Sequence, residues 1–195
     1  DGSLNLIKEI CDRTTGFEFL SFSKNEGLSA ALKAGFDHTI TPLVGYIDAD
    51  LQTHPEDFNL LLYQMGTHTL ITGIRENRQD NWVKRLSSKL ANRFRRIFTK
   101  DGIDDSGCPL KVIQTNYAKR IPMFDGMHRF LPALILLQEG TVKQVPVRHF
   151  PRKAGESKFG FRNRWLVTLV DCVVFLWIKR RYLHYSIQES SDTGE

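Results

Sequence analysis

Short apolar runs alternate with helical segments along the first half of the chain, and this alternation constrains the fold more than any other feature. The spacing of apolar residues predicts helices over residues 4–13 and 28–37, and a third that begins near Pro55. Apolar runs of strand length lie at residues 17–22, 43–47 and 70–73. Strands that alternate with helices of roughly ten residues typically form parallel sheets. We therefore expect an α/β fold with a mostly parallel sheet flanked by helices.

The second half of the chain is less regular. Its predicted elements are a basic helix over 83–98, a strand over 110–113, an apolar helix over 127–137, a strand over 142–150 and a helix over 165–185. A loop rich in Gly, Lys and Arg separates the last two elements, and the final residues are polar.

Size and composition limit the class of protein. The chain has 195 residues, of which 41% are hydrophobic, so it can form one domain with a buried core. Its three cysteines lie far apart without CxxC spacing. This pattern argues against a disulfide framework or a structural zinc site, and is typical of a reducing compartment.

Positive charge is concentrated in two blocks. The net charge is +5; nine of the 27 Lys and Arg residues fall within residues 75–100, and nine more within 148–181. Such blocks favour a polyanionic partner, either a phosphate group, a nucleic acid or an anionic membrane surface. A solvated helix face explains a charge run equally well. Because the chain has no nucleic-acid-binding signature, we do not expect a nucleic-acid partner.

Two carboxylates directly follow the strand predicted at 43–47. Asp48 and Asp50 lie at the carboxyl end of that strand, where open α/β sheets bind ligands. A turn there lets one carboxylate hold a hard divalent cation while the other reaches a ligand or a metal-bound water. Gln52 lies within reach of the same edge. A carboxylate pair after a strand also serves as a simple turn or helix cap, so both interpretations stay open.

The segment from Val44 to Asp57 resembles the metal-binding DxD segment of family 2 glycosyltransferases. It is most similar to the dolichyl-phosphate and undecaprenyl-phosphate sugar transferases, the branch of dolichol-phosphate mannosyltransferase. Other segments match this branch in the expected order: residues 1–3, 25–35, 73–75, 85–92, 104–108, 124–132 and 151–158. The resemblance runs from residue 1 to about residue 181.

The resemblance implies a GT-A (Rossmann-like) fold and an inverting, metal-dependent transfer of a sugar. The donor is a nucleotide-diphosphate sugar, the acceptor a polyprenyl phosphate, and the metal Mg²⁺ or Mn²⁺. Members of the branch start with further strands that hold the nucleotide base. We therefore expect this chain to be an N-terminally incomplete domain, and an inactive remnant is one alternative.

The resemblance also implies roles for individual residues. Asp48, Asp50 and Gln52 hold the metal; Asp48, Asp50 and Asp104 bind the donor; Arg75, Arg85, Ser88, Arg152 and Lys158 bind the acceptor phosphate; and Asp50, Asp105, Arg75 and Arg85 serve catalysis. A phosphate acceptor is already anionic, so it needs positive charge beside it rather than a strong base. Asp105 is a general base if the acceptor is a hydroxyl group; otherwise it shapes the sugar pocket or only forms a turn.

Two histidines and the last helix leave alternatives open. His128 either caps and packs a helix or contacts the sugar or phosphate, and His149 either lines the site or packs in a strand.

Residues 1–161 are expected to form the catalytic domain, 162–185 a helix and 186–195 a polar tail. Trp residues near both ends of the helix and cations beyond them suit a helix that lies in a membrane interface. A core helix is the main alternative, because the apolar stretch is too short to span a bilayer.

These inferences predict a peripheral enzyme on the cytoplasmic face of a membrane, with a membrane partner or homo-oligomer left open. The nearest alternative enzyme is a family 2 transferase with a saccharide hydroxyl acceptor. A basic module that binds a membrane or polyanion without catalysis is the non-enzymatic alternative, although it would have no use for Asp48 and Asp50 beside the basic blocks.

Overall fold

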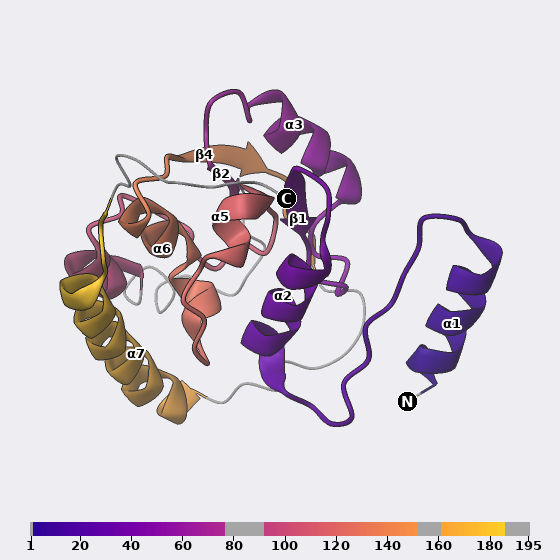
Figure 1. Cartoon of the computed structure of the whole chain (residues 1–195), viewed down its shortest axis with the longest axis horizontal. Helices are drawn as coiled ribbons and strands as arrows, with labels where there is room; N and C mark the ends of the chain where they lie inside the picture. Colours follow the sequence, from indigo (N-terminus) through magenta and orange to yellow (C-terminus); the bar gives the residue numbers. More distant parts are fainter. Residues whose placement is uncertain (1, 77–91, 152–160, 186–195) are drawn as a thin grey trace, which may run out of the picture.

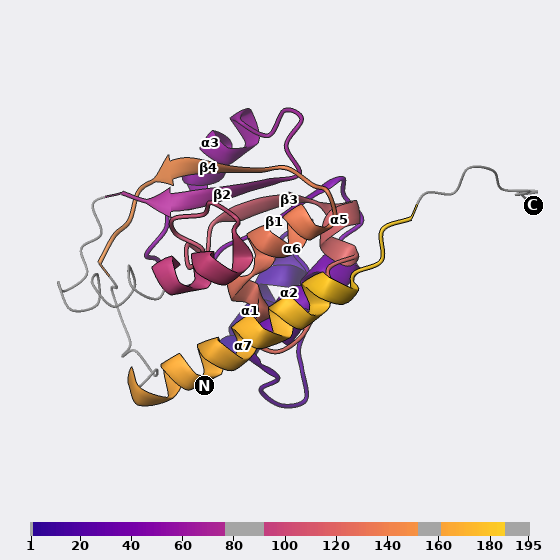
Figure 2. The same cartoon turned by 90° about the vertical axis from the view of Figure 1, so that its left-hand side faces the viewer.

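In the part of the chain that the structure describes, a four-stranded sheet with helices on both faces forms the body (Figures 1 and 2). The computed structural model describes residues 2–76, 92–151 and 161–185. Within them the strands are β1 (Leu43–Tyr46), β2 (Leu70–Arg75), β3 (Lys111–Gln114) and β4 (Val142–Val147), in the spatial order β1-β3-β2-β4. The predicted α/β class is confirmed.

The direction of β3 changes the pairing that the sequence predicts. β3 lies between β1 and β2 and runs antiparallel to both, whereas β2 and β4 pair in parallel. β1, β2 and β4 therefore point the same way, but the sheet is mixed rather than a run of parallel pairs. Because β3 is reversed, its start lies beside the ends of β1 and β2.

Each face of the sheet is covered by its own hydrophobic core. On one face α3 (Phe58–Tyr63) packs over Ile71 and Val112. On the other, α2 (Gly27–His38), α5 (Thr115–Lys119), α6 (Leu131–Leu137) and α7 (Phe161–Arg181) cover Leu70 and Ile113 (Figure 2). Neighbouring residues of one strand thus serve opposite cores, as the alternation of side chains along a strand requires. Each fully buried aliphatic or aromatic side chain contributes about 1.5–3 kcal/mol.

A glycine allows β2 to pack closely against its neighbours. A Cβ atom at Gly73 would lie 2.8 Å from both the Cys108 Sγ and Val147 Cγ2 atoms. Since real contacts of a Cβ atom do not come this close, only glycine fits without a shift of the surrounding chain. This close packing brings the end of β2 next to the end of β4 and to the loop before β3.

The first predicted strand does not form. Residues 17–22 form neither helix nor strand, and Phe17, Phe19, Leu20 and Phe22 are exposed. The helix predicted before them is present as α1 (Ser3–Arg13), which buries no residue and stands apart from the body in Figure 1. A strand needs a neighbour that pairs with its backbone, and none of the described strands pairs with this segment.

The later helices differ in their bounds from the predictions. The helix predicted at 127–137 is split into η2 (Met127–Arg129) and α6, because Pro132 in the first turn of α6 starts a new helix. The helix predicted from Pro55 begins as η1 (Pro55–Asp57) before α3. α7 starts and ends earlier than the predicted 165–185. Of the predicted basic helix 83–98, residues 92–98 are helical and the rest lie outside the described residues.

One ion pair is buried behind the loop that leads to β3. Arg95 donates hydrogen bonds to Asp101 and, at 3.0 Å, to the carbonyl oxygen of Ile103. The side chains of Arg95 and Asp101 are 3% and 0% exposed. Asp101 also accepts a hydrogen bond from the Ile103 N–H, at 3.1 Å. The pair therefore fixes the course of residues 101–103 toward the loop that follows.

Removing this carboxylate should strongly destabilise the protein. We expect Asp101→Ala to lower the free energy of unfolding by about 3–5 kcal/mol, because it leaves the Arg95 charge buried without its partner. Urea unfolding followed by circular dichroism measures the change. Asp104→Ala is the matched control: its partner is Arg96, the pair is exposed, and a surface pair contributes only about 0–1 kcal/mol. Equal losses in both variants would contradict the assignment.

Candidate active site

The chain turns sharply after β1, as the paired carboxylates require. The carboxylate of Asp50 accepts a hydrogen bond from the Gln52 N–H at 3.1 Å, and Leu51 between them has a φ of 60°. A side-chain acceptor two residues ahead of a backbone donor is typical of an Asx turn. The turn brings Asp48, Asp50 and Gln52 to the carboxyl end of the sheet.

A small polar pocket of about 40 Å³ lies at this edge. It is lined by Asp48, Asp50, Gln52, Thr53, Arg75, Gly107, Pro109 and His149. These residues come from the ends of β1 and β2, the loop before β3 and the segment after β4. The structure therefore brings together the predicted metal residues and Arg75, and places His149 among them.

Arg75 and Asp105 form a two-pronged ion pair beside the pocket. The Arg75 Nε and Nη2 atoms donate to the two Asp105 oxygens at 2.7 Å each, and the Arg75 N–H donates at 3.2 Å. Both side chains are largely buried, 14% and 8% exposed. This geometry fixes the direction of both groups, because a planar guanidinium matches a carboxylate in only a few orientations. Asp105 is thus bound to a residue from the end of β2.

Asp104 points elsewhere. Its carboxylate pairs with Arg96 and is 55% exposed, and its N–H donates to the Gln144 side chain at 2.9 Å. It is not among the residues that line the pocket. Four other predicted residues, Arg85, Ser88, Arg152 and Lys158, lie outside the described residues.

A second ion pair ties the DxD segment to the end of β4. The buried Asp57 carboxylate accepts hydrogen bonds from the Arg148 N–H at 3.0 Å, Nε at 2.8 Å and Nη2 at 2.5 Å. The Phe150 N–H donates to the carbonyl oxygen of Gln52 at 2.9 Å. These contacts hold His149 beside Asp48 and Asp50. The pair is not visible in the sequence, where Arg148 is one member of a basic block.

His128 lies away from the pocket. Its Nδ1 atom is 3.1 Å from the hydroxyl oxygen of Ser29 in α2, and the same hydroxyl accepts a hydrogen bond from the Gly126 N–H at 3.1 Å. Burial lowers the pKa of His128 to about 4, and the nearby Arg129 and Lys111 charges act in the same direction. Of its two interpretations, the packing role agrees with these contacts.

The donor set suits a hard divalent cation. Among the residues that the structure describes, no three His, Cys, Asp or Glu side chains are grouped closely enough to form a complete metal cage. Mg²⁺ and similar ions are commonly held by only one or two carboxylates, with water and ligand phosphates as the other ligands. Asp48 and Asp50, with the amide oxygen of Gln52, supply oxygen ligands of this kind around one cavity.

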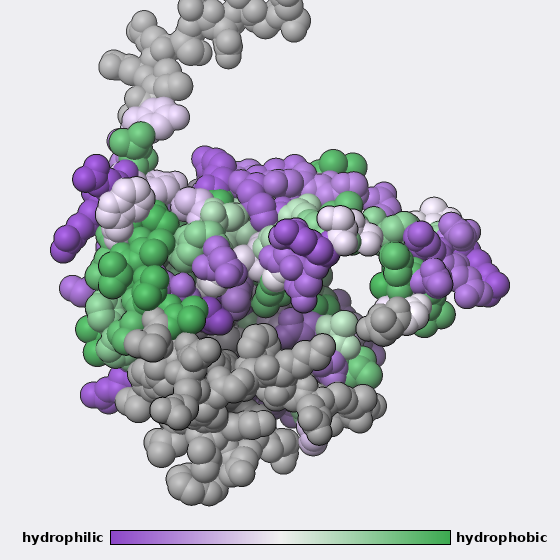
Figure 3. Space-filling model, turned by 90° about the horizontal axis from the view of Figure 1, so that it is seen from below, coloured by the Kyte–Doolittle hydropathy of each residue, from purple (hydrophilic) through white to green (hydrophobic). Residues whose placement is uncertain are grey.

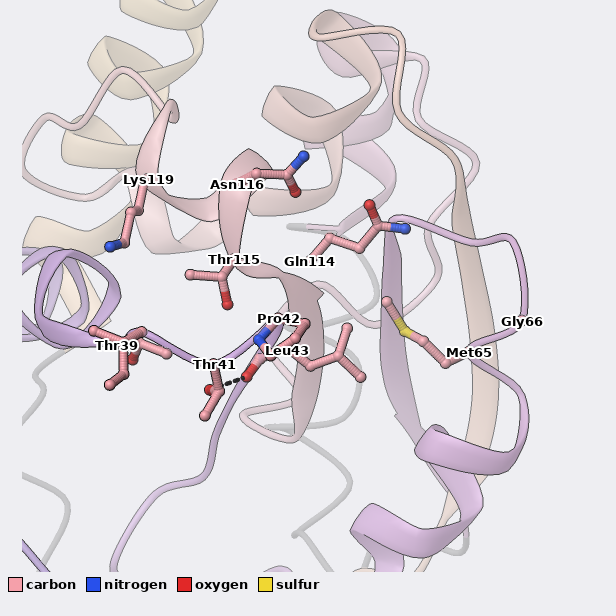
Figure 4. Close-up of a pocket in the computed structure, with 11 residues that line it drawn as sticks. Thr39, Thr41, Pro42, Leu43, Met65, Gly66, Gln114, Thr115, Asn116 and Lys119 are labelled. Carbon is pink, nitrogen blue, oxygen red and sulfur yellow. Dashed lines mark hydrogen bonds between the residues drawn. The ribbon is translucent and has the colours of Figure 1, made fainter. Parts of the chain in front are cut away.

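A larger and more open hollow lies at the opposite end of β1 (Figure 4). It measures about 640 Å³. Its lining includes Thr41, Leu43, Met65, Thr115 and, as its one charged residue, Lys119. Without a carboxylate it offers no ligand set for a divalent cation, so the DxD edge is the better candidate.

Comparisons with known proteins identify the architecture. Residues 1–120 match the family model described as Glycosyl transferase family 2. Among solved structures, glucosyl-3-phosphoglycerate synthase from Mycobacterium tuberculosis, crystallised with Mn²⁺, UDP-glucose and phosphoglyceric acid, is similar with a TM-score of 0.61 and 12% sequence identity. The match covers 84% of this chain and 58% of that one, so the chain spans little more than half of that enzyme's length. At this identity the likeness shows the fold, which is of the GT-A type.

The lowered pKa of His128 predicts that the protein loses stability in mild acid. In the unfolded chain the imidazole binds a proton below about pH 6.5, whereas in the folded chain it does so only near pH 4. The free energy of unfolding should therefore fall by about 1–2 kcal/mol between pH 6.5 and pH 4.5, a discounted value because the ring is only partly buried. Urea unfolding at several pH values measures the slope, and His128→Asn should flatten it. An equal slope in the variant would show that other groups cause the loss.

Proposed function

The chain belongs to glycosyl transferase family 2, and we propose that it transfers a sugar from a nucleotide-diphosphate sugar to a polyprenyl phosphate at a membrane surface. The observation that carries the proposal is the pocket at the carboxyl end of the sheet. There Asp48, Asp50 and Gln52 line one pocket with Arg75, so a candidate cation site adjoins a guanidinium group that Asp105 holds in place.

The carboxylate side of the pocket is the proposed donor site. Asp48 and Asp50 would hold Mg²⁺ or Mn²⁺ with Gln52. When bound, the cation neutralises charge on the donor diphosphate and on the nucleotide that leaves. The Asp50–Gln52 turn orients the ligands, and the Asp57–Arg148 pair holds the segment in place. The Mn²⁺ and UDP-glucose bound to the mycobacterial synthase support this assignment.

The arginine side is the proposed acceptor site. Arg75 lies at the end of β2 within the pocket lining. Arg85, Ser88, Arg152 and Lys158 join it in the proposal through their match to the polyprenyl-phosphate branch. A phosphate monoester and a nucleotide diphosphate repel each other, so cations between them lower the cost of bringing the two together.

The state of Asp105 favours a phosphate acceptor over a saccharide hydroxyl. A hydroxyl acceptor needs a general base within hydrogen-bond reach of its proton. The carboxylate of Asp105 instead accepts three hydrogen bonds from Arg75. A phosphate oxygen is already anionic and attacks without a base, so in this proposal Asp105 orients Arg75 and shapes the pocket.

The outer face of α7 supports a location at a membrane. Cys172 and Phe175 face the core and are 0% and 1% exposed, whereas Val170, Val173 and Trp177 are 61%, 64% and 60% exposed. Figure 3 shows hydrophobic surface gathered on this side of the body. The last three residues of α7 are the exposed cations Lys179, Arg180 and Arg181. An apolar face with adjoining cations suits a helix in the headgroup region, where the phosphate of a polyprenyl chain lies.

None of the helices that the structure describes is both long and apolar enough to cross a bilayer.

The metal assignment predicts that the carboxylates control donor binding. We expect Asp50→Ala to abolish Mn²⁺-dependent binding of UDP-glucose, and Asp48→Ala to weaken it, because a hard cation loses a charged oxygen ligand in each. Isothermal titration calorimetry with and without Mn²⁺ measures the difference. Asp37→Ala, which removes an exposed carboxylate in α2, serves as the control. Unchanged metal dependence in the Asp48→Ala/Asp50→Ala double variant would refute the assignment.

The membrane assignment predicts binding to anionic vesicles through α7. We expect the protein to sediment with vesicles of phosphatidylcholine and phosphatidylglycerol, and high salt to release only part of it, because apolar burial supplies the remainder. Val170→Glu and Val173→Glu should reduce the bound fraction severalfold. Leu60→Glu and Leu62→Glu on α3, at positions 47% and 46% exposed, should leave it unchanged. Equal effects at both sites, or no vesicle binding at all, would contradict an interfacial α7.

A further inference from the structure

A lysine is buried beneath the candidate active site, and none of the roles assigned above uses it. Lys111 is 1% exposed and stands in β3 beside Leu110 and Val112, which are 0% and 2% exposed. Tyr46 and Thr72 are its partners on the two neighbouring strands, so Lys111 stands on an inner strand, at the edge of the sheet where β1 ends. Burial lowers the pKa of this lysine, because an ammonium group loses its hydration there.

The ammonium group binds the main chain of the loop before β3. Its Nζ atom donates to the carbonyl oxygen of Ser106 at 3.2 Å and to that of Cys108. The ring of Tyr46 lies 5.4 Å from the same atom. Lys111 therefore holds residues 106–108 from the interior, through two charge-assisted hydrogen bonds.

The other side of this loop forms a wall of the pocket. Gly107 and Pro109 line it, and Asp105 at the start of the loop binds Arg75. A Cβ atom at Gly107 would lie 3.3 Å from the Arg75 Nη2 atom, so the backbone of the loop packs closely against the arginine. A shift of the loop would therefore move Asp105, Gly107 and Arg75 together.

Stability alone gives little reason for a lysine at this position. Its strand neighbours are apolar, and an apolar side chain of similar length would fill the space without the desolvation of a charge. Residues 106–108 have small side chains that can make few packing contacts. Hydrogen bonds to their carbonyl groups are therefore the main way to hold this loop in one position. Hydrogen bonds from a charged donor are about twice as strong as neutral ones.

We propose that Lys111 is a positioning residue of the candidate active site: it holds the Ser106 and Cys108 carbonyl groups so that Asp105 and Gly107 stay in place at the pocket wall. The identity of the pocket as a nucleotide-sugar site rests on the proposed function above. The contact between Lys111 and the loop is a feature of the structure and is independent of that function.

The first experiment measures UDP binding in the presence of Mn²⁺ by calorimetry. Lys111→Met should weaken binding about tenfold or more, while Lys111→Arg, which keeps a charged donor, should stay within about threefold of the wild type. Ile113→Val on the same strand is the control, since it lowers the melting temperature without touching the loop. If the loss of UDP affinity in each of the three variants is proportional to the fall in its melting temperature, Lys111 has a general structural role and the proposal fails.

The second experiment reports on the loop without any ligand. The thiol of Cys108 is fully buried, so its alkylation rate under native conditions measures local opening. In a Cys11→Ser background, Lys111→Met should raise that rate about tenfold or more and Lys111→Arg should restore it, while buried Cys172 stays unreactive. An unchanged Cys108 rate in Lys111→Met would overturn the proposal.

The two readouts separate the two proposals. If the wild type binds neither UDP nor Mn²⁺, the proposed function fails, and the Cys108 rate alone decides the role of Lys111. If Lys111→Met does not fold, Lys111→Gln takes its place, because it keeps an N–H donor for one of the carbonyl groups.

Discussion

The candidate site depends on the burial of β2 on both faces. Leu70 and Ile71 are fully buried in opposite cores, and β2 pairs with β3 on one side and β4 on the other. Its close approach to its neighbours at Gly73 fixes how the ends of these strands lie relative to one another. Arg75 at the end of β2, the loop before β3 and the segment after β4 meet at one pocket for this reason. The chemistry at the edge is therefore a consequence of packing inside the sheet.

The local parts of this arrangement could be predicted from the sequence. The strand before Asp48, the turn after it and the helices near residues 4–13 and 28–37 follow from apolar spacing and from turn residues. The antiparallel direction of β3 could not, because a short apolar run carries no sign of which way it enters a sheet. The unpaired segment 17–22 shows the same limit, since its composition indicates a strand whether or not a partner strand is present.

The pairs that shape the site were the least visible in the sequence. Arg75 and Asp105 are 30 residues apart, and each has an interpretation of its own, as a phosphate ligand and as a base. Only their contact shows that one orients the other. The burial of Lys111 could not be predicted for a related reason: a lysine between Leu110 and Val112 is typical of a strand residue that faces solvent. α7 was ambiguous because its core face and its outer face are both apolar, and Asp171, which interrupts the apolar run, turns out to bind Arg129.

The contact between Asp57 and Arg148 has a consequence for how this sequence can change over time. The two positions are 91 residues apart, yet loss of Arg148 would leave the buried carboxylate of Asp57 without this partner. A substitution at one of them alters the selective value of residues at the other. The segment that carries the proposed metal ligands and the start of the last basic block are therefore coupled through this one ion pair.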